Sequence, residues 1–231
     1  MKIINIKQLT ILLALILLPF SKVVANSQQH FEKANTLARE GKLQEAIDSY
    51  DLAIKHKPDY AAKAYNNKGL ALDKLGKLQE AIDSYDLAIK YKPDSTEAYY
   101  NKGFALDKLG KLQEAIDSYN LAIKYKHDFA DAYHNKGVSL TNLDKWQEAI
   151  DSFDLAIKYK LDFAEAYYNK GSVLNELGKW QEAIACFDLA IKYKPDHASA
   201  YNNKAAALKK LGKYSQAMEA FSKAKQLKIK H

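Results

Sequence analysis

The chain has 231 residues, of which 48% are hydrophobic and 27% charged, and its formal net charge is +7. Three of these charges belong to Lys2, Lys7 and Lys22, so the remainder carries only about +4 and is mixed with acidic residues. This balance does not predict nucleic-acid binding, which needs a clustered basic surface. The single cysteine, Cys186, excludes a fold that depends on intramolecular disulfides.

Residues 1–25 have the pattern of a secretory signal peptide. Lys2 and Lys7 precede an apolar stretch at 9–20, and residues 23–25 supply the small side chains that a signal peptidase reads. We expect cleavage after Ala25 and a mature protein that is exported, either periplasmic or secreted. The alternative is an uncleaved membrane anchor, for which the apolar stretch is short.

The rest of the chain is a tandem repeat. Segment 77–90 returns almost unchanged at 42–55 and 111–124, and in looser form at 145–158, 179–192 and 213–226. The spacing is 34 residues, with one extra residue near 59–62 that indicates a loop. A regular period of this length predicts an array in which each unit packs on its neighbours. The predicted units are 27–61, 62–95, 96–129, 130–163, 164–197 and 198–231.

Within the unit at 96–129, apolar residues recur at helical intervals on either side of Gly110, which predicts two helices joined by a left-handed turn. Aspartates such as Asp94 lie where they could cap the next first helix. On the second helices we expect ion pairs four residues apart. These are Asp51–Lys55, Asp86–Lys90, Asp154–Lys158 and Asp188–Lys192.

One set of residues recurs at fixed positions in the units. In the second unit these are Tyr65, Gly69, Leu72, Gly76, Ala81, Tyr85, Ala88 and Pro93. The pattern resembles that of the tetratricopeptide repeat family and covers residues 27–231. The resemblance implies an all-α, right-handed superhelical solenoid of antiparallel helix pairs. It further implies a concave groove, lined by the first helices, that binds a protein or peptide segment without catalysis or cofactors.

The predicted peptide-binding residues lie on the first helices. One asparagine recurs per unit, and a row of carboxamides can pair with the backbone of an extended segment. The alternative is that these asparagines are family consensus or bond locally. Aromatic and imidazole side chains provide anchoring area beside them. The full set is Asn67, Asn101, Asn135, Asn169, Asn203, Tyr100, Phe104, His134 and Tyr168.

A lysine precedes the small residue of the first helix in all six units, where the family pattern is usually apolar. These residues are Lys33, Lys68, Lys102, Lys136, Lys170 and Lys204. We expect the carbon stems to pack while the ammonium groups reach solvent, and the alternative is a positive ladder beside the groove. The basic clamp by which some family members hold acidic chaperone tails is not reproduced, since Glu97 and Asn101 occupy its third-unit sites.

No enzyme signature is present in the sequence: the histidines lack metal-ligand spacing and no nucleophile has a distinct partner. We therefore expect no catalytic, metal or cofactor site. The second function considered is self-association as a homodimer through the C-terminal unit, whose last helix has no following unit to cover it. The candidate residues for this contact are Phe221, Ala224 and Leu227.

Overall fold

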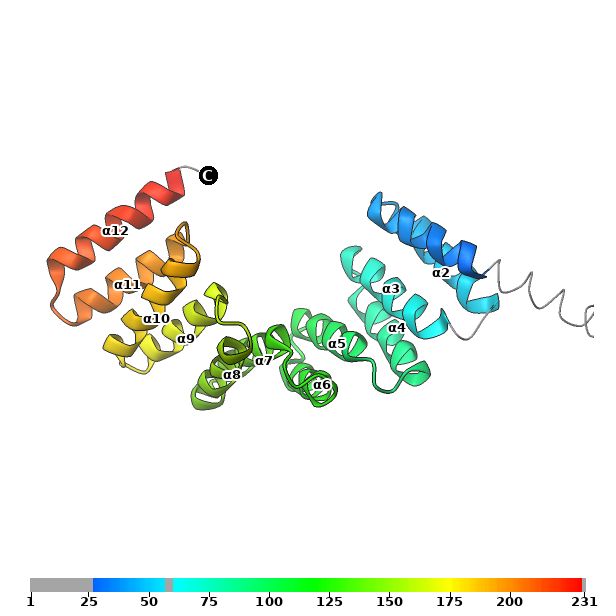
Figure 1. The fold of residues 1–231 in the computed structure, drawn as a ribbon, viewed down its shortest axis with the longest axis horizontal. Coiled ribbons are helices and arrows are strands. Elements are labelled where there is room, and N and C mark those ends of the chain that lie inside the picture. Colours follow the sequence, from blue (N-terminus) through cyan, green and yellow to red (C-terminus); the bar gives the residue numbers. More distant parts are fainter. Residues whose placement is uncertain (1–26, 57–59, 230–231) are drawn as a thin grey trace, which may run out of the picture. The chain divides into compact units, whose positions relative to one another are not determined.

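The computed structural model describes residues 27–56 and 60–229, so the predicted signal peptide and part of the loop near 59–62 lie outside the described residues (Figure 1). The described secondary structure is helical, without a strand in these ranges. A first helix covers residues 27–39. It is followed by α2 (Leu43–His56), α3 (Ala61–Lys74), α4 (Leu78–Tyr91), α5 (Thr96–Lys108), α6 (Leu112–Tyr125), α7 (Ala130–Asn142), α8 (Trp146–Tyr159), α9 (Ala164–Glu176), α10 (Trp180–Tyr193), α11 (Ala198–Lys210) and α12 (Tyr214–Ile229).

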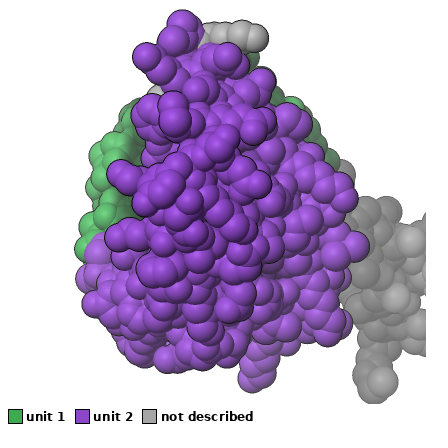
Figure 2. Space-filling model, turned by 90° about the vertical axis from the view of Figure 1, so that its left-hand side faces the viewer, with its two compact units in different colours: residues 1–109 green, residues 110–231 purple. Residues whose placement is uncertain are grey.

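The chain forms two compact units that meet in sequence after Leu109, coloured separately in Figure 2. In the first, α3 packs on α4 and α4 on α5; in the second, each helix from α6 to α12 packs on the next. Neighbouring first helices also contact each other, for example α7 and α9. Neighbouring second helices, such as α8 and α10, contact each other less. Within each unit the first helices therefore form the inner layer. The all-α solenoid class is confirmed.

The turn between the two helices of a repeat needs a left-handed residue, as predicted. Gly41, Gly76, Gly110, Gly178 and Gly212 have φ between 71° and 78°, and Asp144 takes the same place with φ 57°. A side chain in this region is strained, although aspartate tolerates it better than most residues.

We expect Asp144→Gly to raise the free energy of unfolding by about 1 kcal/mol, because glycine removes the left-handed strain at this turn. Urea denaturation followed by circular dichroism measures the change. The matched variant is Gly178→Asp, for which we expect a loss of similar size. A loss in both variants would show that the Asp144 side chain makes a compensating contact.

In the inner helix pairs, a buried aromatic ring of the second helix packs against a glycine of the first helix. Tyr85, Tyr119, Phe153 and Phe187 are fully or almost fully buried. A Cβ atom added at Gly137 would lie 2.6 Å from Cε1 of Phe153, closer than any real contact. The glycine is therefore what lets the two helices approach over the ring.

Two local expectations from the sequence are wrong. The N-cap residue of α5 is Ser95 and that of α9 is Phe163, so Asp94 and Asp162 do not cap these helices with their carboxylates. The predicted pairs four residues apart on the second helices also give way to pairs between neighbouring repeats, because each of these aspartates faces the next first helix.

Candidate functional site

The five predicted asparagines occupy equivalent, half-buried positions on the first helices α3, α5, α7, α9 and α11. Four of them donate a hydrogen bond from Nδ2 to the preceding first helix. The acceptors are Asn35 Oδ1 at 3.0 Å from Asn67, Asn66 Oδ1 at 3.0 Å from Asn101, His134 Nε2 at 2.9 Å from Asn169, and the Tyr168 hydroxyl at 3.3 Å from Asn203. These amide groups thus join the repeats. Within the part of the chain that the structure describes, Asn101, Asn169 and Asn203 take part in this ladder through Nδ2 and not through Oδ1.

His134 links two of these asparagines within the second unit. Its Nδ1 lies 3.1 Å from Asn135 Oδ1 and its Nε2 accepts from Asn169, so the neutral Nδ1–H tautomer satisfies both contacts. The ring packs against Phe163 in a tilted arrangement, with centroids 4.8 Å apart and an interplanar angle of 40°. Burial lowers the pKa of His134, because the charged imidazolium would lose its hydration. The side chain is therefore a neutral bridge at neutral pH.

The remaining predicted aromatic residues have different environments. Tyr168 is half-buried, and its ring lies against His197 with centroids 4.7 Å apart. Phe104 is exposed, with the Lys108 ammonium 4.6 Å from its ring centre. Tyr100 is half-buried on the same helix as Phe104. Of these three, Phe104 offers the largest free surface for a ligand.

Each unit has a pocket on its first-helix side that includes one of the asparagines. In the first unit, Asn67 lines a pocket of about 350 Å³ together with Arg39, Tyr50 and Lys74. In the second, a pocket of about 280 Å³ is lined by Val138, Trp146, Phe153, Asn169, Val173 and Glu176, among others. The first pocket offers basic groups, whereas the second offers apolar walls and one acid. Sequence reasoning did not single out Arg39, Lys74 or Trp146, although Arg39 and Lys74 occupy the same position of successive repeats and Trp146 recurs as Trp180.

The family assignment follows from comparison with known repeats. The tetratricopeptide repeat profile matches residues 62–95, 96–129 and 198–230, a second profile of this description matches 130–163, and a TPR repeat profile matches 171–212. The chain belongs to the tetratricopeptide repeat family. No curated protein matches the sequence.

Solved tetratricopeptide structures share this fold. A MamA crystal structure is 27% identical over 74% of this chain and 94% of its own, with a TM-score of 0.69. YrrB, described as a TPR protein with an unusual peptide-binding site, is 23% identical over 80% and 95%, with a TM-score of 0.67. A tetratricopeptide repeat protein from Parabacteroides merdae is 22% identical over 87% and 80%, with a TM-score of 0.74.

In this tetratricopeptide array the recurrent lysines are ion-paired. The Nζ–Oδ1 distances are 2.6 Å for Lys68–Asp51, 2.6 Å for Lys102–Asp86, 2.5 Å for Lys170–Asp154 and 2.6 Å for Lys204–Asp188. The lysine side chains are only 22–26% exposed, so the stems pack as predicted, but each ammonium meets an aspartate of the preceding repeat. A free positive ladder is excluded at these four positions.

Lys136 departs from this series because Asn120 stands where four other repeats have aspartate. Burial lowers the pKa of Lys136, with partial compensation from Glu148. We expect Asn120→Asp to complete the series and raise the free energy of unfolding by about 0.5 kcal/mol, the usual size of a partly exposed pair. The matched variant Asp86→Asn should cost a similar amount, and Asn120→Asp should have no effect in a Lys136→Met background. All three are measured by urea denaturation.

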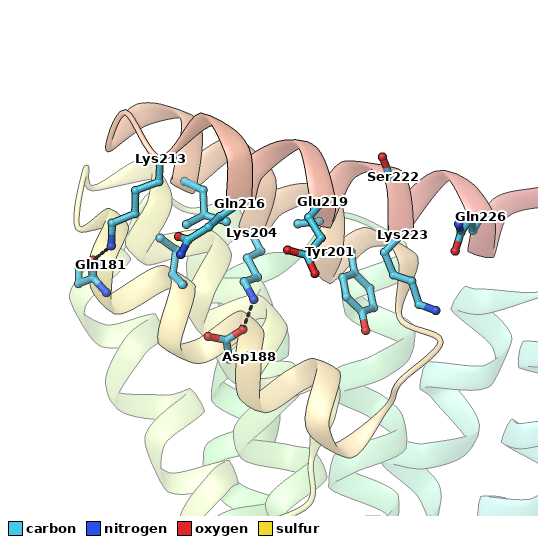
Figure 3. Close-up of a pocket in the computed structure, with 13 residues that line it drawn as sticks. Gln181, Asp188, Tyr201, Lys204, Lys213, Gln216, Glu219, Ser222, Lys223 and Gln226 are labelled. Carbon is cyan, nitrogen blue, oxygen red and sulfur yellow. Dashed lines mark hydrogen bonds and ion pairs between the residues drawn. The ribbon is translucent and has the colours of Figure 1, made fainter.

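In the last tetratricopeptide repeat, the three predicted self-association residues differ in their exposure to solvent. Phe221 is exposed, Ala224 is buried and Leu227 is half-buried. Phe221 lies beside two exposed residues that sequence reasoning missed, Tyr214 and Met218. The sequence alone could have identified these two residues, because they occupy positions that are apolar throughout the repeats. On the other side of α12, a polar cleft of about 960 Å³ contains the Lys204–Asp188 pair (Figure 3).

Among the described residues, no group of three or more histidine, cysteine or acidic side chains could hold a metal ion. Burial raises the pKa of the Cys186 thiol, which disfavours the reactive thiolate. Over the same described ranges, none of the helices combines the length and apolar character needed to span a membrane.

Proposed function

We propose that the protein is a non-catalytic scaffold that binds an extended peptide or protein segment on its first-helix face. The observation that carries the proposal is the pairing of asparagine and pocket in both units, at Asn67 and at Asn169. A side chain of the ligand would enter the pocket while the carboxamide oxygen accepts a backbone N–H. YrrB, which has the same fold, has a peptide-binding site by its description.

The two pockets favour different ligand side chains. Arg39 and Lys74 suit an acidic or polar side chain in the first unit. Val138, Trp146 and Val173 suit an apolar one in the second. The proposal therefore predicts a segment that has polar and apolar anchors at separate positions.

The experiment is a capture of extracytoplasmic proteins by the mature chain and by the triple variant Asn101→Ala, Asn135→Ala, Asn169→Ala. We expect the variant to lose partners that the native chain keeps, while its helical circular dichroism is unchanged. The matched control is Gln44→Ala, Gln79→Ala, Gln147→Ala, because these exposed glutamines on the second helices each donate to an aspartate of the same helix. Equal capture by all three proteins would remove the asparagines from recognition.

We also propose that the protein is exported. The basis is the sequence of residues 1–25, which lie outside the described residues. Mass spectrometry of the protein from its native cells should give a mature chain that begins at Asn26. An intact N-terminus in a membrane fraction would support the anchor instead.

Self-association through the last repeat is the second candidate function, and the exposure of Phe221 favours it. The charge of this repeat opposes it, since residues 198–231 contain eight lysines and one acid, Glu219. Two such surfaces repel each other when they meet. If a homodimer forms here, Leu227→Glu or Phe221→Glu should shift the chain to a monomer in sedimentation equilibrium.

A further inference from the structure

The C-terminal end of the second unit has an apolar groove between α11 and α12. We name it the end groove; it has a volume of about 490 Å³ and is lined by Asn202, Ala206, Lys209, Tyr214, Met218 and Phe221, among others. Figure 2 looks onto the end of the second unit where these two helices lie. The end groove is separate from the asparagine pockets, so it is independent of the function proposed above.

The end groove has the shape that a first helix fills elsewhere in the array. Ile184 of α10 packs against α11 and is 6% exposed, whereas Met218, its equivalent 34 residues later, is 73% exposed. Phe187 is fully buried, whereas the equivalent Phe221 is 56% exposed. The groove is therefore complementary to a helix, because the same positions bind one in the preceding repeat.

The charge around the end groove identifies the kind of helix. Lys209 lines the groove, and Lys225 follows Phe221 by one turn on the exposed side of α12. Glu219, the only acid of residues 198–231, lines the polar cleft on the other side of α12 (Figure 3). These residues hold eight lysines and one acid, so their net charge equals the +7 of the whole chain. A helix that carries carboxylates complements this surface.

One residue of α12 differs from its equivalents in the earlier repeats, and this changes the side chain that a bound helix needs at the matching position. In four earlier repeats an aspartate of the second helix holds the lysine of the next first helix, as Asp188 holds Lys204 at 2.6 Å. The equivalent residue of α12 is Ser222, which lines the end groove and points away from α10 in Figure 3. A lysine at the matching position would meet a hydroxyl and nearby ammonium groups, whereas a carboxylate would accept from the hydroxyl.

We propose that the end groove binds an acidic amphipathic helix of a partner protein, which takes the place that a seventh first helix would occupy. Its contact side follows α11, in which Ala200 and Ala207 are fully buried and Lys204 lies between them. The partner helix has a small or β-branched apolar residue at the two alanine positions, as α9 has Ala166 and Val173, and a glutamate or aspartate at the lysine position. Tyr214, Met218 and Phe221 bury its apolar side.

A second copy of this chain fits the end groove poorly. Its helix at 27–39 has the exposed polar residues Gln29 and Thr36 where later first helices have buried small ones such as Ala200 and Ala207. Lys33 would also arrive at Ser222 without an aspartate partner. Face-to-face pairing of two end grooves would bring together two copies of Lys209 and Lys225.

The test uses two labelled 13-residue peptides with blocked ends, titrated against the full chain by fluorescence anisotropy. One has the sequence of α9, residues 164–176, and the other has the same sequence with Lys170→Glu. We expect the Lys170→Glu peptide to bind about tenfold more tightly, the effect of replacing a charge repulsion by an attraction. The difference should shrink at high salt.

Two protein variants locate the effect. Ser222→Asp restores the aspartate of the earlier repeats, so it should reverse the preference in favour of the unchanged α9 peptide. Met218→Glu should weaken both peptides, and since Met218 is exposed the fold should be retained, as circular dichroism would show.

Equal affinity for the two peptides, or no reversal in Ser222→Asp, overturns the proposal. A dimer in sedimentation equilibrium that Met218→Glu dissociates and the Lys170→Glu peptide does not displace would assign the groove to a second copy. Binding to phosphatidylserine vesicles without binding to either peptide would assign it to a membrane surface. Either of these results also overturns the proposal.

Discussion

Replacing Phe153 by alanine is expected to lower the free energy of unfolding by about 3–5 kcal/mol, the range for removing a fully buried aromatic ring. The ring is inaccessible to solvent and belongs to the core that joins α7, α8, α9 and α10. It also fills the space over Gly137, which has no side chain to replace it. The cavity cannot close without moving two helices. The loss is measured as a shift of the urea denaturation curve.

The matched control is Phe221→Ala, at the equivalent position of the last repeat. Because that ring is more than half exposed, we expect a loss below about 1 kcal/mol, the usual size for a surface substitution. The contrast isolates burial, since residue type and repeat position are the same. Similar losses at the two positions would mean that the end groove is already covered in solution, which would contradict its availability to a partner.

The fold was predictable because it repeats. A glycine that recurs every 34 residues, and an aspartate in its place at Asp144, identify the same left-handed turn six times over. The buried aromatic residues were predictable in the same way, because an aromatic residue and a glycine that recur together in successive units indicate a packing contact. Local pattern and global fold agree in such arrays, and this agreement makes the prediction reliable.

Side-chain partners between repeats were not predictable from spacing along one helix. Asp86 has Lys90 four residues away, but it pairs with Lys102 of the next first helix at 2.6 Å. The nearer lysine is exposed to solvent, whereas the packed stem of Lys102 places its ammonium beside the carboxylate. Tertiary packing decides between two candidates that look equivalent in the sequence.

The candidate site was predicted only in outline. The recurrent asparagines were recognised as a row, and the structure adds that Nδ2 of Asn101 and Asn169 already bonds the preceding repeat. Their role in binding a ligand remains a prediction. The basic cluster at 198–231 was missed because the net charge was considered for the chain as a whole. Counting charges repeat by repeat reveals it without a structure.

Acidification is expected to destabilise the fold, and His134 should account for much of the effect. Burial lowers the folded-state pKa of His134. The hydrogen bond to Asn135 and the charges of Asp131 and Glu165 oppose this, and Lys160 lowers the pKa further. The unfolded chain therefore binds a proton first as the pH falls below about 6.5. The stability contribution is complete above that pH and is lost as the pH falls toward the folded-state pKa. Each pKa unit between the two states corresponds to about 1.4 kcal/mol.

The chain itself supplies the variant that tests this. In the second repeat Asn66 stands at the position of His134 and accepts from Asn101 as His134 accepts from Asn169. His134→Asn should therefore keep the ladder of bonds at pH 7.5 and flatten the fall in denaturation midpoint between pH 7.5 and 5.

His197, whose pKa is also lowered by burial, leaves a residual slope. His127→Asn, at an exposed site, should follow the native curve. An unchanged slope in His134→Asn would contradict a neutral bridging role for this imidazole. A loss of stability already at pH 7.5 would mean that its ring contact with Phe163 matters more than its hydrogen bonds.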